Sequence, residues 1–236
     1  MFVEKNMNFN DWKYLYNWDG KNWHRANLVY TPYISPDGNT LCMSFNRDIN
    51  YHTNLAENEL WTDQLLNDRF SREIKFHSMA KAAGIPTLNI IDVDLGKRLI
   101  SFEWHGADFY TQGFDSLDNW QNQWLERITQ MWNAGIYKFS LHPNSWVAHE
   151  GTLIPFNWFF CFTKDESIVI RDFLIQISYE RQEKMEQFLK SLNLDLDKAY
   201  DPIGLQILAF LSFKSNYPDE LIKQVIKNHD ILRQNS

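Results

Sequence analysis

The first pattern along the chain is a pair of apolar segments separated by a turn. Ala26–Tyr30 is a short apolar run, and in Leu41–Phe45 the apolar side chains alternate, so they share one face of a strand. Between these segments, Pro36-Asp37-Gly38-Asn39 is typical of a tight turn. The sequence therefore predicts two paired strands in this region.

The hydrophobic period changes to that of a helix over Glu57–Ala83. Gly84, followed two residues later by a proline, is typical of the end of a helix. We expect the helix to pack on the strands through Phe70, Ile74 and Met79. The apolar residues near helical spacing are Leu60, Trp61, Leu65, Leu66, Phe70, Ile74, Met79 and Ala80.

Two further strands and a second helix are predicted next. Leu88–Val93 and Lys97–Trp104 are rich in residues that favour strands, and the short polar segment between them indicates a hairpin. Helical periodicity returns over Leu117–Asn133, with Asp115-Ser116 as a candidate cap and Gly135 as the stop.

The rest of the chain is predicted to contain short strands and then helices. The short β-rich segments are Trp146–Ala148, Leu153–Ile154, Trp158–Phe162 and Ile168–Ile170. Helical periodicity covers Ile177–Leu192, Pro202–Phe213 and Pro218–Leu232. This order of strands and helices predicts an α+β fold, and since no linker-like segment interrupts it, residues 1–236 are expected to form one domain.

Composition and charge exclude several classes of protein. The chain has 236 residues, of which 44% are hydrophobic, and a formal net charge of -7. It is long enough to bury a core, and too anionic for a general affinity for nucleic acid or anionic membranes. No apolar run approaches the roughly 18 residues that cross a bilayer, and Met1–Trp12 lacks the apolar stretch of a signal peptide. We expect a cytoplasmic protein without a membrane span, and its abundance of Asn, Lys and Ile is typical of an AT-rich phage or bacterial genome.

The aromatic residues and the two cysteines are expected to serve structural roles. Aromatic residues make up 16% of the chain, including 10 Trp, which favours a core and interface rich in rings over a surface that stacks on bases or sugars. Cys42 and Cys161 lie in apolar, strand-like runs. They are predicted to be small buried side chains, and neither a disulfide nor a zinc site is expected.

A family resemblance begins in the first predicted helix. Phe70-Ser71-Arg72-Glu73 lies in that helix, Ala83-Gly84-Ile85-Pro86 follows its end, and Phe102-Glu103-Trp104 ends the hairpin. This order resembles the small lobe of kinase-like phosphotransferases, which implies a two-lobed protein-kinase-like fold. A sheet lobe with one helix would extend to about residue 104, and a reduced, mainly helical lobe would cover 105–236. The resemblance assigns nucleotide contacts to Glu73, Glu103 and Trp104.

A second part of the resemblance follows the second predicted helix. Leu141-His142-Pro143 resembles the catalytic loop His-x-Asp-Leu-His-Pro-x-Asn of the aminoglycoside-phosphotransferase branch. In this register the catalytic aspartate falls on Ser140, with His142 nearby. The metal-binding asparagine falls on Ser145, and the metal-binding aspartate of the next motif falls on Asn157. Every charged catalytic position is then neutral.

A second register stays open. The segment Thr152-Leu153-Ile154-Pro155-Phe156-Asn157 also resembles the loop, and a second hairpin then leads to Asp172 in place of the Asp-Phe-Gly motif. In this register Asn157 and Asp172 hold magnesium, and the catalytic aspartate is replaced by Thr152. The first register is favoured because it keeps Leu-His-Pro and needs no long insertion after the helix.

The resemblance also calls for a lysine on the second strand to hold phosphate. Leu41-Cys42-Met43-Ser44-Phe45 has none, and Arg47 is the nearest cation; no glycine-rich phosphate loop precedes the strand. Neither Ser140 nor Thr152 accepts a proton at neutral pH. Both registers therefore lack the base and the lysine of phosphoryl transfer.

Each candidate residue also has a plain structural interpretation. Glu73 lies on a mostly polar helix face, which is typical of a solvated residue. His142 precedes a proline and fits a loop histidine bonded to backbone. Asp172 precedes an apolar helical stretch and equally fits a helix N-cap, and Asn157 fits a turn or strand-end residue.

Three functions are compatible with these residues. The first is a catalytically degenerate kinase-like domain, a pseudokinase that binds or scaffolds a protein partner. The second is an active ATP-dependent phosphotransferase in which Asn157 and Asp172 hold magnesium and Arg47 or another cation holds phosphate. The third is a structural or accessory protein that uses the fold for protein interaction alone. Any binding of ATP and magnesium is expected to be weak, because Asn157 offers a neutral amide where magnesium prefers anionic oxygen. The sequence indicates neither a substrate nor an oligomeric state.

Overall fold

The structure of the protein is a computed structural model. It describes residues 11–14, 30–46, 63–104, 108–109, 117–138, 145–166, 220–221, 223–224 and 227. The strand predicted at Ile168–Ile170 and the helices predicted at Ile177–Leu192 and Pro202–Phe213 lie outside these residues. The last described residues are helical and belong to the predicted helix Pro218–Leu232.

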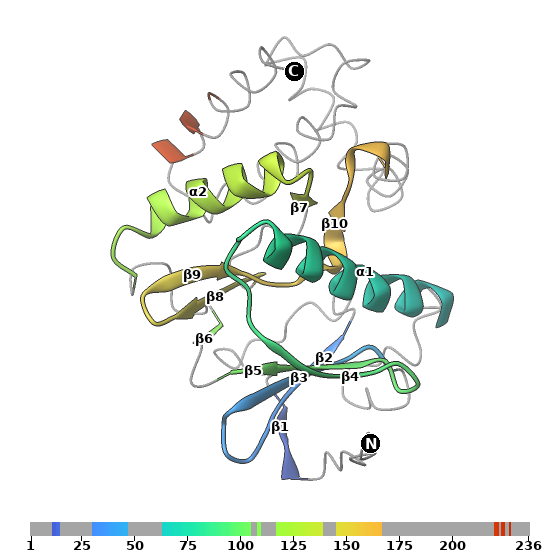
Figure 1. Ribbon diagram of the computed structural model, residues 1–236. Helices are drawn as coiled ribbons and strands as arrows, with labels where there is room; N and C mark the ends of the chain where they lie inside the picture. Colours follow the sequence, from blue (N-terminus) through green and yellow to red (C-terminus); the bar gives the residue numbers. More distant parts are fainter. Residues whose placement is uncertain are drawn as a thin grey trace, which may run out of the picture.

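A five-stranded antiparallel sheet of order β1-β2-β3-β5-β4 forms the lower part of the molecule in Figure 1. The strands are β1 (Lys13–Tyr14), β2 (Thr31–Ile34), β3 (Thr40–Ser44), β4 (Ile90–Asp94) and β5 (Leu99–Glu103). Leu41, Met43 and Phe45 all belong to the main hydrophobic core, as their alternation predicts, whereas Cys42 packs in a separate cluster with Tyr33 and Leu99. The two faces of β3 therefore bury different sets of side chains.

The first strand of the predicted pair begins later than its apolar run. β2 pairs with β3 from Thr31 opposite Ser44 to Ile34 opposite Leu41, while residues 26–29 lie outside the described residues. The intervening turn fixes this register, because Asp37 Oδ1 accepts from the Asn39 amide at 3.1 Å and glycine at position 38 has a φ of 74°. Hydrogen-bonded turn geometry, rather than hydrophobicity, sets the strand boundary.

Helix α1 (Asp63–Ala82) confirms the predicted helix and its stop. A buried stripe runs along it with alternating spacings of four and three residues. After the helix, Gly84 has a φ of 73°, and the Ile85 amide donates to the carbonyl of Ala80 at 3.0 Å. The buried stripe consists of Leu66, Phe70, Glu73, His77 and Ala80.

The packing of α1 on the sheet differs in one respect from the prediction. Phe70 lies in the main core and Ile74 packs against it, as expected. Met79 is not a member of that core, and the prediction for this residue is wrong. Leu66, one turn before Phe70, is a further member of that core.

The second half of the described chain contains one helix and three short strand pairings. α2 (Trp120–Asn133) ends before Gly135, whose φ is 69°. The strands are β6 (Asp108–Phe109), β7 (Tyr137–Lys138), β8 (Trp146–His149), β9 (Thr152–Pro155) and β10 (Cys161–Phe162). β6, β8 and β9 form a three-stranded sheet in that order, and β7 pairs with β10.

The predicted hairpin at residues 146–154 is confirmed, and the strand predicted at Trp158–Phe162 is wrong over its first part. Glu150 and Gly151 have φ values of 48° and 73°, the backbone that a two-residue hairpin turn requires. After β9, Asn157 adopts a φ of 61° and begins a 3₁₀ turn, Trp158–Phe160. This turn buries both Trp158 and Phe159.

The main core joins the five-stranded sheet and α1 to the β8–β9 hairpin and the 3₁₀ turn. Figure 1 shows α1 running between the five-stranded sheet and α2. Cys42 and Cys161 are free and buried, as predicted. The fold is therefore α+β, with antiparallel sheets. The main core consists of Tyr30, Ile34, Leu41, Met43, Phe45, Leu66, Phe70, Leu88, Ile100, Phe102, Trp104, Val147, Ile154, Phe156 and Phe159.

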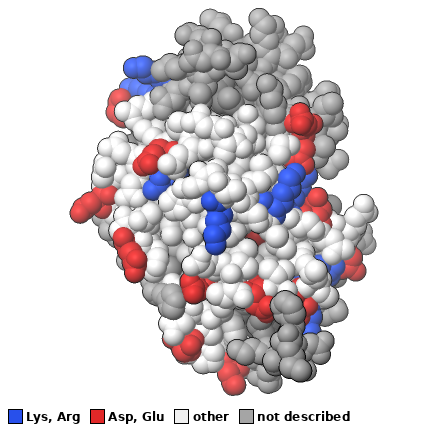
Figure 2. All heavy atoms as spheres, in the orientation of Figure 1, with Lys and Arg blue, Asp and Glu red and all other residues white. Residues whose placement is uncertain are grey.

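The surface carries charges of both signs. On the side drawn in Figure 2, lysine and arginine side chains are interspersed with aspartate and glutamate side chains. Some form exposed pairs, such as Arg98 with Asp63 at 2.8 Å. Among the helices of the described residues, none combines the length and apolarity needed to cross a membrane.

Candidate functional site

Asn157 lies at the meeting point of three elements. Its side chain is buried, and its Oδ1 accepts a hydrogen bond of 2.6 Å from the hydroxyl of Tyr30, which precedes β2. Its Nδ2 donates to Ser145 Oγ at 3.4 Å, immediately before β8. The two positions to which the first register assigns metal ligands, Ser145 and Asn157, are thus in contact. Both carry neutral side chains, and the amide oxygen is already bonded.

Tyr30 is held as a neutral phenol. Its ring is buried between Phe45 and Phe159, with centroids at 5.7 and 5.6 Å. Burial, followed by the nearby charge of Glu73, raises the pKa of Tyr30 far above its ordinary value. The phenol therefore remains a hydrogen-bond donor to Asn157 at every physiological pH.

Glu73 is fully buried, so the prediction of a solvated glutamate is wrong. Because the stripe of α1 that contains Glu73 packs on the 3₁₀ turn, the carboxylate points into the protein. Its Oε2 accepts from the amide of Phe159 at 2.8 Å. Burial raises the pKa of Glu73, while the charge of Lys138 and the amides of Phe159 and Trp158 oppose this rise. The Glu73 carboxylate is therefore hydrogen-bonded to the main chain.

Lys138 supplies a cation that the sequence analysis did not single out. It lies on β7, has no exposed surface, and its Nζ donates to the carbonyls of Phe156 at 2.5 Å and Asn157 at 2.7 Å. Its ammonium lies 5.5 Å from the centre of the Trp158 ring. Burial lowers the pKa of Lys138, and electrostatic interactions with the side chains of Cys161 and Glu73 oppose this effect. A lone lysine inside the apolar run Ile136–Phe139 was the signal for it.

β3 offers no cation, as the sequence predicts. Its residues are threonine, leucine, cysteine, methionine and serine, and all but the first are buried. Arg47 lies outside the described residues. Within the described part of the chain, the buried lysine that acts on Glu73 comes from β7 and not from the sheet.

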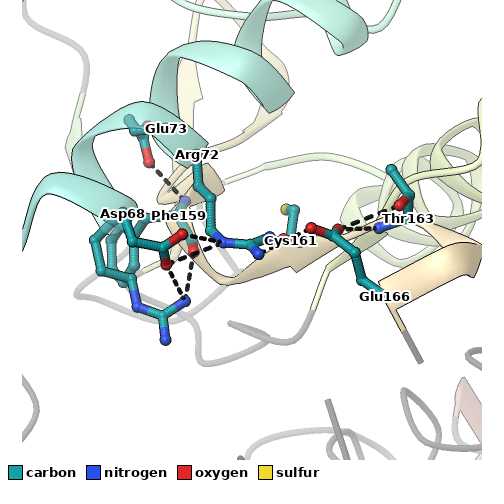
Figure 3. A network of polar contacts seen from close by, with 8 residues as sticks. Asp68, Arg72, Glu73, Phe159, Cys161, Thr163 and Glu166 are labelled. Atoms are coloured by element: carbon teal, nitrogen blue, oxygen red, sulfur yellow. Dashed lines mark hydrogen bonds and ion pairs between the residues drawn. The ribbon is translucent and has the colours of Figure 1, made fainter. Parts of the chain in front are cut away.

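Two arginines of α1 also bind the segment of residues 159–166. Figure 3 shows Arg72 between Asp68 and Glu166, with Glu73 bonded to Phe159. Arg72 Nη2 lies 2.8 Å from Glu166, and Arg72 Nη1 donates to the Cys161 carbonyl at 3.2 Å. One turn earlier, Arg69 Nη1 donates to the Phe159 carbonyl at 3.3 Å.

Aromatic side chains fill the space between the sheet and the β8–β9 hairpin. Phe156 packs edge-on against Phe102 of β5, with ring centroids 5.5 Å apart, and against Trp104 at 6.4 Å. All three rings are buried in the main core. That core joins β3 and β5 to β8 and β9 through continuous apolar contact, so the two sides are not separated by a polar groove at this point.

Glu103 and Trp104 are engaged in internal contacts. The Glu103 carboxylate accepts from Asn89 Nδ2 at 2.9 Å, and the Glu103 amide donates to the Asn89 carbonyl. The Trp104 amide donates to the carbonyl of Asn39 at 2.8 Å. These amides, one at the last residue of β5 and one directly after it, are therefore bonded within the protein.

The remaining candidates are placed as follows. Thr152 lies at the start of β9, opposite His149. Ser140, His142 and Asp172 lie outside the described residues. Among the described residues, no three or more His, Cys, Asp and Glu side chains gather closely enough to hold a metal ion.

Comparisons with known proteins find similarity to solved structures. No protein-family model matches the chain, and no curated protein matches it. Among solved structures, the chain is similar to the medium-resolution structure of the bifunctional kinase-methyltransferase WbdD, with a TM-score of 0.48 and 10% sequence identity. The likeness covers 92% of this chain and 50% of that chain, so this chain spans about half the length of that protein.

Proposed function

We propose that residues 1–236 form a kinase-like domain that has lost phosphotransfer chemistry and acts as a pseudokinase by binding or scaffolding a protein partner. The small lobe extends to about residue 104, and the rest forms a mainly helical lobe. The family order of sheet, helix with an inward glutamate, hairpin and following turn supports this assignment.

The observation that carries the proposal is the aromatic packing around Phe156. In kinase-like enzymes the nucleotide lies between the small-lobe sheet and the hairpin after the catalytic loop. Here Phe102, Trp104 and Phe156 occupy that interval, and each has at most 6% of its surface exposed. Binding an adenine ring would require these side chains to leave a packed core, where a large-to-small change alone costs about 3–5 kcal/mol.

The polar positions support the same conclusion. Phosphoryl transfer needs a lysine on the nucleotide phosphates and magnesium ligands between them. β3 carries no lysine, and Asn157 has a neutral amide whose oxygen is bonded by Tyr30. Magnesium prefers hard, anionic oxygen ligands, so an amide in this state is a poor partner for it. The first register is favoured again, because the segment after Asn157 is a 3₁₀ turn and not the first strand of a second hairpin.

The test is ligand-dependent thermal stability of the full chain. A ligand that binds the native state at one hundred times its dissociation constant stabilises it by roughly 2.7 kcal/mol. We expect no rise in melting temperature with Mg–ATP and no phosphorylation of the protein or of generic acceptors. A saturable rise together with steady product formation, both lost in Asp172→Ala, would overturn the proposal in favour of an active enzyme that uses the second register.

A further inference from the structure

Two buried charges bind the same short turn. Lys138 donates to the carbonyls of Phe156 and Asn157, and Glu73 accepts from the amide of Phe159. Neither charged side chain has exposed surface. Lys138 therefore binds carbonyl groups of the turn Phe156–Phe159, and Glu73 binds an amide of the same turn.

Burying these charges separately would be strongly unfavourable. An isolated ammonium or carboxylate loses its hydration in the interior, and only an opposite charge with good hydrogen bonds compensates for the loss. The charge of Lys138 favours the ionised form of Glu73, and the charge of Glu73 favours the ionised form of Lys138. Each residue thus makes the burial of the other tolerable.

We propose that Glu73 and Lys138 form one internal ionic clamp that holds the turn Phe156–Phe159, and with it the Tyr30–Asn157 contact, closed without nucleotide or metal. The inference rests on the proposed function and deepens it, since it names what keeps the candidate site closed. In phosphotransferases of this kind the helix glutamate pairs with a strand lysine that contacts phosphate. Here its partner lies in the core and binds only protein.

The backbone of the turn explains why a clamp is needed. Asn157 has a φ of 61°, a left-handed conformation that is unfavourable for residues other than glycine, although less so for asparagine. The conformation turns the amide side chain toward Tyr30 and Ser145. Hydrogen bonds from Lys138 on the Phe156 and Asn157 carbonyls fix the peptide groups on both sides of this residue.

The neighbouring ionisable groups do not compete with the pair. Tyr30 and Cys161 are the buried groups that interact with Glu73, and burial raises the pKa of both, that of Cys161 to about 12. Both therefore stay neutral at physiological pH. Arg72, the other cation that acts on Cys161, is bonded to Asp68 and Glu166.

The test is a double-mutant cycle on the full chain, read by native-state hydrogen exchange at the Phe159 amide. Glu73→Gln and Lys138→Met should each speed this exchange at least tenfold, while amides of β3 and β5 keep their protection. In the Glu73→Gln background, Lys138→Met should speed it much less than in the wild type. Lys81→Met is the matched control, because Lys81 lies on the same helix with an exposed side chain, and it should leave the exchange unchanged.

The outcomes separate the clamp from the proposed function. Independent effects of Glu73→Gln and Lys138→Met, or no effect at the Phe159 amide, overturn the clamp whatever the nucleotide result. If Mg–ATP stabilises the wild type while the two substitutions remain coupled, the proposed function fails and the clamp survives. If the variants do not fold, the wild-type protein provides the test by NMR. The signal of the Lys138 ammonium should shift as the Glu73 carboxyl titrates, and a signal that does not change during this titration overturns the clamp.

Discussion

Removal of the Phe156 ring tests directly whether aromatic side chains close the candidate site. Phe156 is 1% exposed and packs edge-on against Phe102 and Trp104 at 5.5 and 6.4 Å. Truncation of a fully buried phenylalanine to alanine costs about 3–5 kcal/mol, and each edge-to-face pair accounts for about 0.5–1.5 kcal/mol of it. We therefore expect Phe156→Ala to lower the free energy of unfolding by about 4 kcal/mol.

Urea unfolding of the full chain, followed by circular dichroism, measures this loss. The midpoint should fall while the slope with urea stays constant, because the surface exposed on unfolding hardly changes. In a cycle with Phe102→Ala, the two rings should be coupled by about 1 kcal/mol. Phe160→Ala is the control, since its ring is only partly buried in the neighbouring 3₁₀ turn.

A small effect at Phe156 would refute the reasoning. If the ring bordered a water-filled groove, alanine would leave no enclosed cavity, and only the transfer of the side chain, about 2 kcal/mol or less, would be lost. A loss no larger than that of Phe160→Ala would therefore mean that the space between sheet and hairpin is open. The case against nucleotide binding would then lose its main support.

Three further predictions concern other parts of the fold. Burial lowers the pKa of His77, so the unfolded chain binds a proton at higher pH than the folded protein, and stability should fall as pH drops below 6.5. His77→Gln should remove this loss in urea titrations at several pH values, and a variant with the same pH profile as the wild type would contradict the prediction. Gly151→Ala should cost about 1–2 kcal/mol through its φ of 73° alone, since nothing lies within 4 Å of an added Cβ, whereas Gly96→Ala, without a positive φ, should cost clearly less. Arg72→Ala should cost about 2 kcal/mol in thermal unfolding, whereas Lys223→Ala, from an exposed pair, should cost under about 0.5 kcal/mol; equal losses would show that burial of the ion pair does not matter.

Local patterns were sufficient for most of the described elements. α1, the β4–β5 hairpin, α2 and the β8–β9 hairpin were predicted because periodicity, glycine stops and two-residue turns act over a few neighbouring residues. The apolar run Ala26–Tyr30 lies outside the described residues except for Tyr30, and β2 is described from Thr31. The strand predicted over Trp158–Phe160 failed: aromatic residues favour strands, but the left-handed Asn157 redirects the chain.

The environment of the candidate residues could not be predicted from their own segments. The residues around Glu73 on α1 are mostly polar, yet it is buried because α1 packs on a turn more than eighty residues later. The importance of Lys138 depends on two carbonyls that only the fold brings to it. The family resemblance named Asn157 as a candidate site residue, but its phenol partner lies 127 positions away. Long-range contacts of this kind leave no periodic signal.

Under the proposed function, the charges of the kinase-like site are relocated and not simply lost. A phosphotransferase keeps its cation and carboxylates at a solvent-facing groove, because they must meet phosphate and metal there. In this protein Glu73 and Lys138 lie in the interior, where both side chains bind main-chain groups. Removing one of two buried charges that interact leaves the other uncompensated, which is strongly destabilising. In an enzyme, a carboxylate and a cation of this kind would bind nucleotide phosphates and metal at the surface. Here the charges of Glu73 and Lys138 bind the protein's own backbone, so the backbone occupies the site as soon as the chain folds.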